Sequence, residues 1–189
     1  MGLGRVEAFS DGVIAVIVTI MVLELKPPAS GEWAALAALQ LPLLNYALSF
    51  IVIAIMWVNY RTTLGLVRHV NAHVLWANNN LLFWMSLIPL ATAYMGQTKA
   101  APLSVAGYGG VLAATAAAFT LLRFVIADQH KADESLARRH QRIHRKNIFG
   151  TLLYTASVPL AFVSVRASFF VFILIPALYF LPERWLESE

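Results

Sequence analysis

Ionisable side chains within or beside apolar runs are the residues of this chain best placed to do chemistry. Asp11 lies about two residues inside the first apolar run, and His73 opens a later one. Glu24 and Lys26 lie at the far end of the first run. Charge inside a bilayer is costly, so each of these residues is a functional candidate. The central parts of most later runs carry no acid or base, which argues against a proton-relay transporter or a membrane hydrolase.

Sequence motifs for enzymatic chemistry are missing from the chain. It has no cysteine, which excludes disulfides, thiolate metal sites and cysteine nucleophiles. It also lacks a P-loop, a GxSxG elbow and a dinucleotide fingerprint. His140 and His144 are four residues apart, but no third ligand accompanies them at motif spacing. We therefore expect no enzymatic activity, no resident metal and no cofactor.

The elements that must position the candidate residues are predicted to be transmembrane helices. Of the 189 residues, 59% are hydrophobic and 13% are charged, and the mean hydropathy is +0.68, whereas soluble domains are about 45–50% apolar and about 25% charged. A helix spans the hydrocarbon with about 20 residues. We expect one all-α integral membrane domain over residues 1–189, with six transmembrane helices at about 9–25, 36–60, 73–95, 103–126, 148–165 and 167–181.

The basic residues predict how these helices are oriented. With the N-terminus inside, 11 of the 14 lysines and arginines fall in cytoplasmic segments, and both termini are cytoplasmic. They lie between apolar runs rather than on one face of a soluble domain, so the net charge of +4 does not indicate nucleic acid. The basic segment 128–147 is either a solvated cytoplasmic loop or a helix along the leaflet surface. The first run reads as a retained helix rather than a signal peptide, because no small-residue cleavage site follows it.

The first helix has one narrow apolar face. At 100° per residue, this face carries Phe9, Gly12, Val16, Thr19, Ile20 and Leu23, and Asp11 points about 140° away from Val16. Such a stripe suits a symmetry axis, but periodicity alone favours ordinary core packing.

Two later helices carry side chains that predict contacts with neighbouring helices. Asn78, Asn79 and Asn80 are consecutive amides at membrane depth, so they should face protein that can form hydrogen bonds with them. Asp11 and His73 are the partners that the sequence suggests. A small residue at every fourth position of the fourth helix predicts close approach to a neighbour, at Ala106, Gly110, Ala114 and Ala118.

The first helix also resembles a known family. Arg5, Phe9, Ser10 and Asp11 match the Arg-x-x-x-Phe-Ser-Asp signature of the transmembrane protein 175 family, which comprises endosomal, lysosomal and prokaryotic potassium channels. Weaker matches follow in later helices, at Trp57, His73, Trp76, Asn78 and the Ser-Leu-Ile-Pro run at 86–89. The resemblance covers the six-helix layout of the whole chain.

The resemblance implies a weakly selective, potassium-permeable channel without a carbonyl filter, in which the first helices of a four-fold assembly line the pore. Carried onto this chain, the pore positions are Val16, Thr19 or Ile20, and Leu23. A supporting network that holds the pore helix would comprise Arg5, Phe9, Ser10, Asp11, His73 and Asn78.

The same resemblance implies the assembly, the partners and the location. A chain with one repeat would form a homotetramer, in contact with membrane lipid in a prokaryotic plasma membrane. Potassium and other monovalent cations would be its permeant partners. A small secondary transporter and a non-conducting structural subunit are the alternative functions.

The sequence departs from the family pattern in two places. Asn59, Tyr60 and Arg61 follow Trp57 where the family often has histidines. Val16 stands where Ile or Leu is common at the narrowest position, so we expect a wider ring there.

Overall fold

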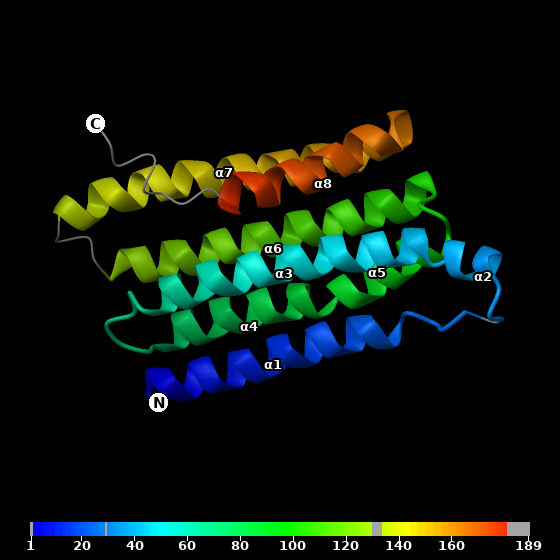
Figure 1. The fold of residues 1–189 in the computed structure, drawn as a ribbon. Helices are drawn as coiled ribbons and strands as arrows, with labels where there is room; N and C mark the ends of the chain where they lie inside the picture. The colour runs from blue at the N-terminus through cyan, green and yellow to red at the C-terminus, as the bar shows by residue number, and fades with distance from the viewer. Residues whose placement is uncertain (1, 29, 130–133, 181–189) are drawn as a thin grey trace.

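The computed structural model describes residues 2–28, 30–129 and 134–180, with only the backbone described for residues 134–146 and 180. These residues are helical with short connections, and no strand occurs among them (Figure 1). The helices are α1 (Leu3–Leu23), α2 (Trp33–Ala37), α3 (Gln40–Leu64), α4 (Ala72–Ser86), α5 (Ile88–Gln97), α6 (Pro102–Asp128), α7 (Glu134–Val163) and α8 (Val165–Phe180).

Three of the resulting elements have the length and composition of membrane spans. Within the described residues, Leu3–Leu23, Trp33–Leu64 and Pro102–Asp128 are long and apolar enough to cross a bilayer. Asn147–Val163 and Val165–Tyr179 are shorter apolar helices. The pair α4 and α5 follows α3 along the chain, and the long helices run roughly side by side (Figure 1). The described part of the chain is therefore all-helical and has the apolar helices of a membrane protein.

The helix predicted over 73–95 is broken into α4 and α5 at Leu87. Pro89 lies in the first turn of α5 and has no backbone N–H to donate to the preceding turn. Asn71 caps the start of α4, because its Oδ1 accepts a hydrogen bond of 2.9 Å from the Val74 N–H.

Two other helices begin earlier than the sequence indicated. α1 begins at Leu3, so its first turns precede the predicted start at Phe9. α7 begins at Glu134 and takes in most of the basic segment 128–147. Residues 134–146 contain neither Gly nor Pro and are rich in strong helix formers, which explains why the helix continues through them.

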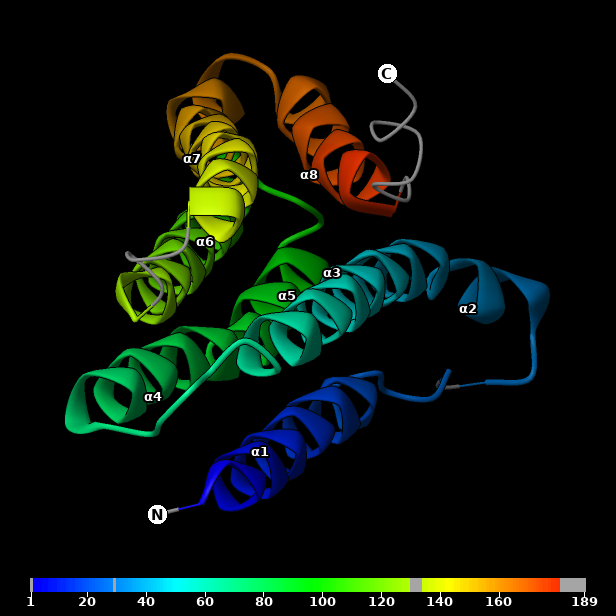
Figure 2. The same cartoon turned by 90° about the vertical axis from the view of Figure 1, so that its left-hand side faces the viewer.

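Packing places α1 at the border of the bundle. It contacts α3, α4 and α5, while α6 packs on α7 and α4, and α8 packs on α7 and α3. Viewed along the helices, α1 lies on the outside with one side uncovered (Figure 2). The interior is mostly apolar and includes a hydroxyl cluster in which Ser49 Oγ lies 2.8 Å from Thr92 Oγ1 and 2.9 Å from the Tyr108 hydroxyl.

Candidate functional site: the first helix and its supports

α1 buries one face and leaves the opposite face without contacts. Residues at spacings of three or four pack against α3, α4 and α5, which is the spacing of one face of a helix. They are Val6, Ser10, Ile14, Ile17 and Met21. The predicted stripe is exposed instead: Val16 is 54% exposed and Leu23 is 79% exposed. The stripe therefore lies outside the core of the single chain, and core packing does not explain it.

The one hydroxyl on the stripe is fixed to its own helix. Thr19 is exposed, and its Oγ1 donates a hydrogen bond of 2.9 Å to the Val16 carbonyl oxygen. Ile20 and Phe9 are exposed beside it. The stripe thus presents apolar side chains and one hydroxyl oxygen, whose proton is already used in a hydrogen bond. No charged residue lies between Phe9 and Leu23 on that face.

A buried amide joins the opposite face of α1 to two neighbouring helices. Asn78 on α4 donates from Nδ2 to Ser10 Oγ at 3.0 Å. Its Oδ1 accepts a hydrogen bond of 2.7 Å from the Tyr60 hydroxyl on α3. All three side chains are buried, so each bond satisfies a polar group that has no access to water.

Asp11 is held on the side of α1 by two residues of α3. Its Oδ1 accepts a hydrogen bond of 2.8 Å from Trp57 Nε1, and its Oδ2 accepts one of 2.9 Å from an Arg61 guanidinium nitrogen. The Arg61 guanidinium also lies 5.8 Å from the Trp57 ring centroid. The Arg61 side chain is 49% exposed and the Asp11 side chain 33%, so solvent screens this ion pair.

The structure brings together part of the network that the sequence predicted. Ser10 and Asn78 are bonded to each other, and Asp11 points away from the stripe. The expectation that Asp11 is a partner of the asparagines on α4 is wrong, because its carboxylate oxygens accept hydrogen bonds from Trp57 and Arg61 of α3.

Three predicted members of the network lie apart from it. Arg5, Phe9 and His73 are exposed, and none forms a side-chain hydrogen bond with the described residues. Phe9 lies on the stripe, as the helical geometry required, so within one chain it cannot also support the buried face.

Sequence reasoning missed Tyr60 and Arg61 as supports. They occupy the segment where the family often has histidines. This departure from the family pattern is the sequence feature that could have pointed to them. Trp57 and Arg61 are four residues apart, which places them on one face of α3. That spacing could have indicated a shared partner, but not which helix would supply it.

The described part of the chain offers no metal centre. It contains no group of three or more His, Asp or Glu residues that could hold an ion. The His140 and His144 side chains lie outside the residues whose side chains are described.

A protein-family model matches the part of the chain that contains α1 and the helices that support it, α3 and α4. A family model described as endosomal/lysosomal potassium channel TMEM175 matches residues 5–89. A protein of Chryseobacterium sp. (strain P1-3) that is named a potassium channel is 36% identical over 188 residues, which is 98% of this chain and 96% of that one. This chain belongs to the TMEM175 family.

Other TMEM175-type relatives agree in sequence and in fold. A protein of Streptomyces collinus that is named a potassium channel is 36% identical over 173 residues, covering 85% of this chain and 83% of that one. The crystal structure of a lysosomal potassium-selective channel TMEM175 homolog from Chamaesiphon minutus superposes with a TM-score of 0.82. It is 29% identical and covers 94% of this chain and 95% of that chain.

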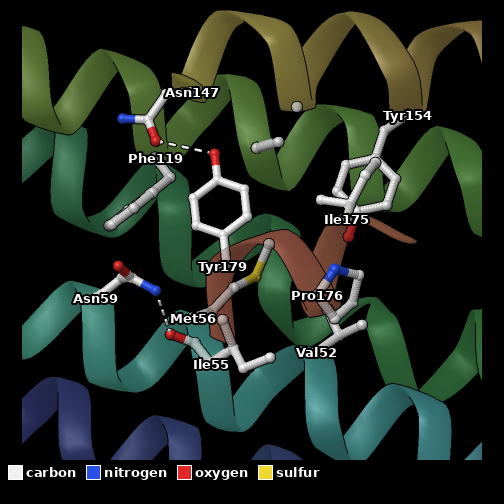
Figure 3. Close-up of a pocket in the computed structure, with 12 residues that line it drawn as sticks. Val52, Ile55, Met56, Asn59, Phe119, Asn147, Tyr154, Ile175, Pro176 and Tyr179 are labelled. Atoms are coloured by element: carbon white, nitrogen blue, oxygen red, sulfur yellow. Dashed lines mark hydrogen bonds between the residues drawn. The ribbon is translucent and has the colours of Figure 1, made fainter. Parts of the chain in front are cut away.

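A cavity of about 50 Å³ lies away from α1, between α3, α6, α7 and α8 (Figure 3). Its walls are mostly apolar. At one edge Asn147 Oδ1 accepts a hydrogen bond of 3.1 Å from the Tyr179 hydroxyl. Arg123 also donates to Asn147 Oδ1 and to Thr63 Oγ1. No residue of α1 lines this cavity, so it is not part of the candidate pore.

Proposed function

We propose that this protein is a potassium-permeable, weakly selective cation channel of the cell membrane, formed by four copies whose α1 helices surround the pore. Membership of the TMEM175 family supports the channel class. The observation that carries the proposal is the uncovered stripe of α1. This face of the helix is left exposed by the other described residues, and it runs the length of a membrane span.

Closure requires several copies, and four is the number that the resemblance to the family implies. One chain supplies one α1, and a single helix cannot enclose a path for ions. A ring of identical chains closes around an axis when each turns the same face inward. With the N-terminus in the cytoplasm, the stripe runs from Phe9 near the inner mouth to Leu23 near the outer mouth.

Rings of Val16, Thr19 or Ile20, and Leu23 would make the constriction. Apolar rings gate by excluding water, and an ion passes only as far as it can keep or replace its hydration. The Thr19 proton is engaged by the Val16 carbonyl, so the hydroxyl offers an acceptor oxygen to a passing cation. Val16 is smaller than the Ile or Leu common in the family, which favours a wider ring and weak discrimination between potassium and sodium.

Potassium flux in purified proteoliposomes tests this function. Liposomes loaded with potassium are diluted into a potassium-free buffer, and efflux is followed with no sodium or proton gradient available for coupling. The channel releases potassium under these conditions, whereas a secondary transporter requires the coupling ion and a structural subunit releases none. Flux that appears only with a coupling ion would overturn the proposal.

Selectivity is tested at the narrowest ring. We expect Val16→Ala to raise conductance and to lower the ratio of potassium to sodium permeability, because removing two methyl groups from each of four subunits widens the constriction. Val18→Ala is the matched control, since Val18 is half-buried against the core and turned about 200° from Val16. Equal effects of the two substitutions would move the constriction elsewhere.

A further inference from the structure

Two of the three consecutive asparagines on α4 have no side-chain hydrogen-bond partner among the described residues. Asn78 is bonded to Ser10 and Tyr60. Asn79 is exposed and Asn80 is half-buried, and neither forms a hydrogen bond with the described residues. A primary amide has two donors and two acceptor lone pairs to satisfy.

The depth of Asn79 makes this lack of partners costly in lipid. Asn79 follows Ala72, the first residue of α4, by seven positions, which places it roughly 10 Å into a span at the helical rise. Hydrocarbon offers no hydrogen bonds at that depth, and polar groups there face protein or water. An asparagine side chain is too short to reach the headgroup region from such a position.

The surface around Asn79 is continuous with the α1 side of the bundle. His73, Trp76, Asn79 and Phe83 share one side of α4, at spacings of three and four residues, and we call this set the α4 face. All four are exposed, with Trp76 at 71%. α4 lies between α1 and α6 with its outer side uncovered (Figure 2).

We infer that the α4 face is covered by a second copy of this chain, and that the Asn79 amide forms a hydrogen bond with that copy across the contact. The inference rests on the proposed channel, because a ring closed around α1 requires neighbours to meet along the sides next to α1. In such a ring the contact is heterologous, so the α4 face meets a different surface of the next subunit. Amides that bond across helices are a common means of association within bilayers.

Spin labelling of a chain that has no native cysteine tests this contact. A nitroxide is attached to Asn79→Cys, and to Phe83→Cys and Trp76→Cys, which keep the amide if loss of Asn79 impairs assembly. Leu152→Cys is the matched control, because Leu152 is exposed on α7 about five residues inside the apolar part of that helix. Spectra are recorded in liposomes with molecular oxygen and a water-soluble nickel chelate as relaxation agents.

At the α4 face we expect an immobilised nitroxide, with oxygen accessibility several-fold below that of Leu152→Cys and little access to the nickel chelate. Dilution with unlabelled chain should remove any dipolar broadening between copies. Oxygen accessibility equal to that of the control would show that lipid covers the face and would overturn the inference. High access to the chelate would show an aqueous crevice and would overturn it equally. Potassium flux of the unlabelled protein is scored separately, so a lipid-facing Asn79 in a conducting protein refutes this contact alone.

Discussion

At the residue scale, the supports of α1 differ in how much they contribute because they differ in burial. Asn78, Ser10 and Tyr60 are sealed from water, whereas Asp11 and Arg61 are partly solvated. A buried polar group that loses its partner pays its full desolvation penalty. A solvated ion pair is replaced in part by water.

Asn78→Ala should therefore be the most damaging change in this set. It leaves the Ser10 and Tyr60 hydroxyls buried without their bonds, and we expect a loss of roughly 2–3 kcal/mol in the free energy of unfolding. The measurement is the melting temperature of the purified protein in detergent, followed by tryptophan fluorescence. An unchanged melting temperature would show that Asn78 does not link α1 to α3.

Asp11→Ala should cost less, about 1 kcal/mol, because the ion pair is partly exposed. It should lower the yield of assembled protein more than it changes the ratio of potassium to sodium permeability, since the carboxylate is held by Trp57 and Arg61 away from the stripe. Arg61→Ala is the companion variant and should have a similar effect. A stable Asp11→Ala protein with altered selectivity would place this carboxylate in the ion path.

At the element scale, the rotation of α1 about its own axis decides which residues meet ions. Single cysteines at Val16, Thr19 and Leu23 should react with a thiol reagent that enters an open pore, and potassium flux should fall as they react. Val18→Cys should not respond, because Val18 packs toward the core. Equal sensitivity at Val16 and Val18 would mean that the stripe does not line the pore.

The packing of α6 on α7 depends on one glycine. A Cβ added at Gly109 would lie 2.5 Å from Ser157 Oγ, whereas a Cβ at Gly110 would meet nothing within 4 Å. The Ser157 hydroxyl is buried and donates to the Tyr154 carbonyl oxygen, so it cannot move without losing that bond. Gly109→Ala should destabilise the protein by about 1–3 kcal/mol, and Gly110→Ala should not. The measurement is the melting temperature of each variant, and equal values for Gly109→Ala and Gly110→Ala would contradict the close approach of α6 and α7.

At the scale of the whole molecule, further copies of the chain would cover the exposed faces of α1 and α4 in the proposed channel. The described residues leave exposed an apolar stripe on α1 and the Asn79 amide on α4. We expect four chains of 20.9 kDa each in the purified particle, measured by light scattering with the detergent contribution subtracted. A protein that conducts potassium as a monomer would contradict a pore made by four α1 helices.

The sequence by itself determined the class of protein and which residues of its first helix share a face. Span-length apolar runs and scarce charge are local properties of composition, so they identify a helical membrane protein without tertiary information. The 100° step of the helix placed Val16 and Leu23 on one side and Asp11 on another, and the structure has the same arrangement. The signature at Arg5 to Asp11 pointed to the family that the comparisons then showed.

Only the tertiary structure decided which helices supply the partners. Asp11 is bonded from α3 rather than by an asparagine of α4, and Gly109 makes the close approach that the small-residue pattern assigned to Gly110. The structure also separated Asn78, which is bonded to Ser10 and Tyr60, from Asn79, whose side chain has no hydrogen-bond partner among the described residues. The reason is physical: periodicity fixes the direction of a side chain relative to its own helix axis, whereas its partner depends on how neighbouring helices are shifted and rotated when their side chains interdigitate.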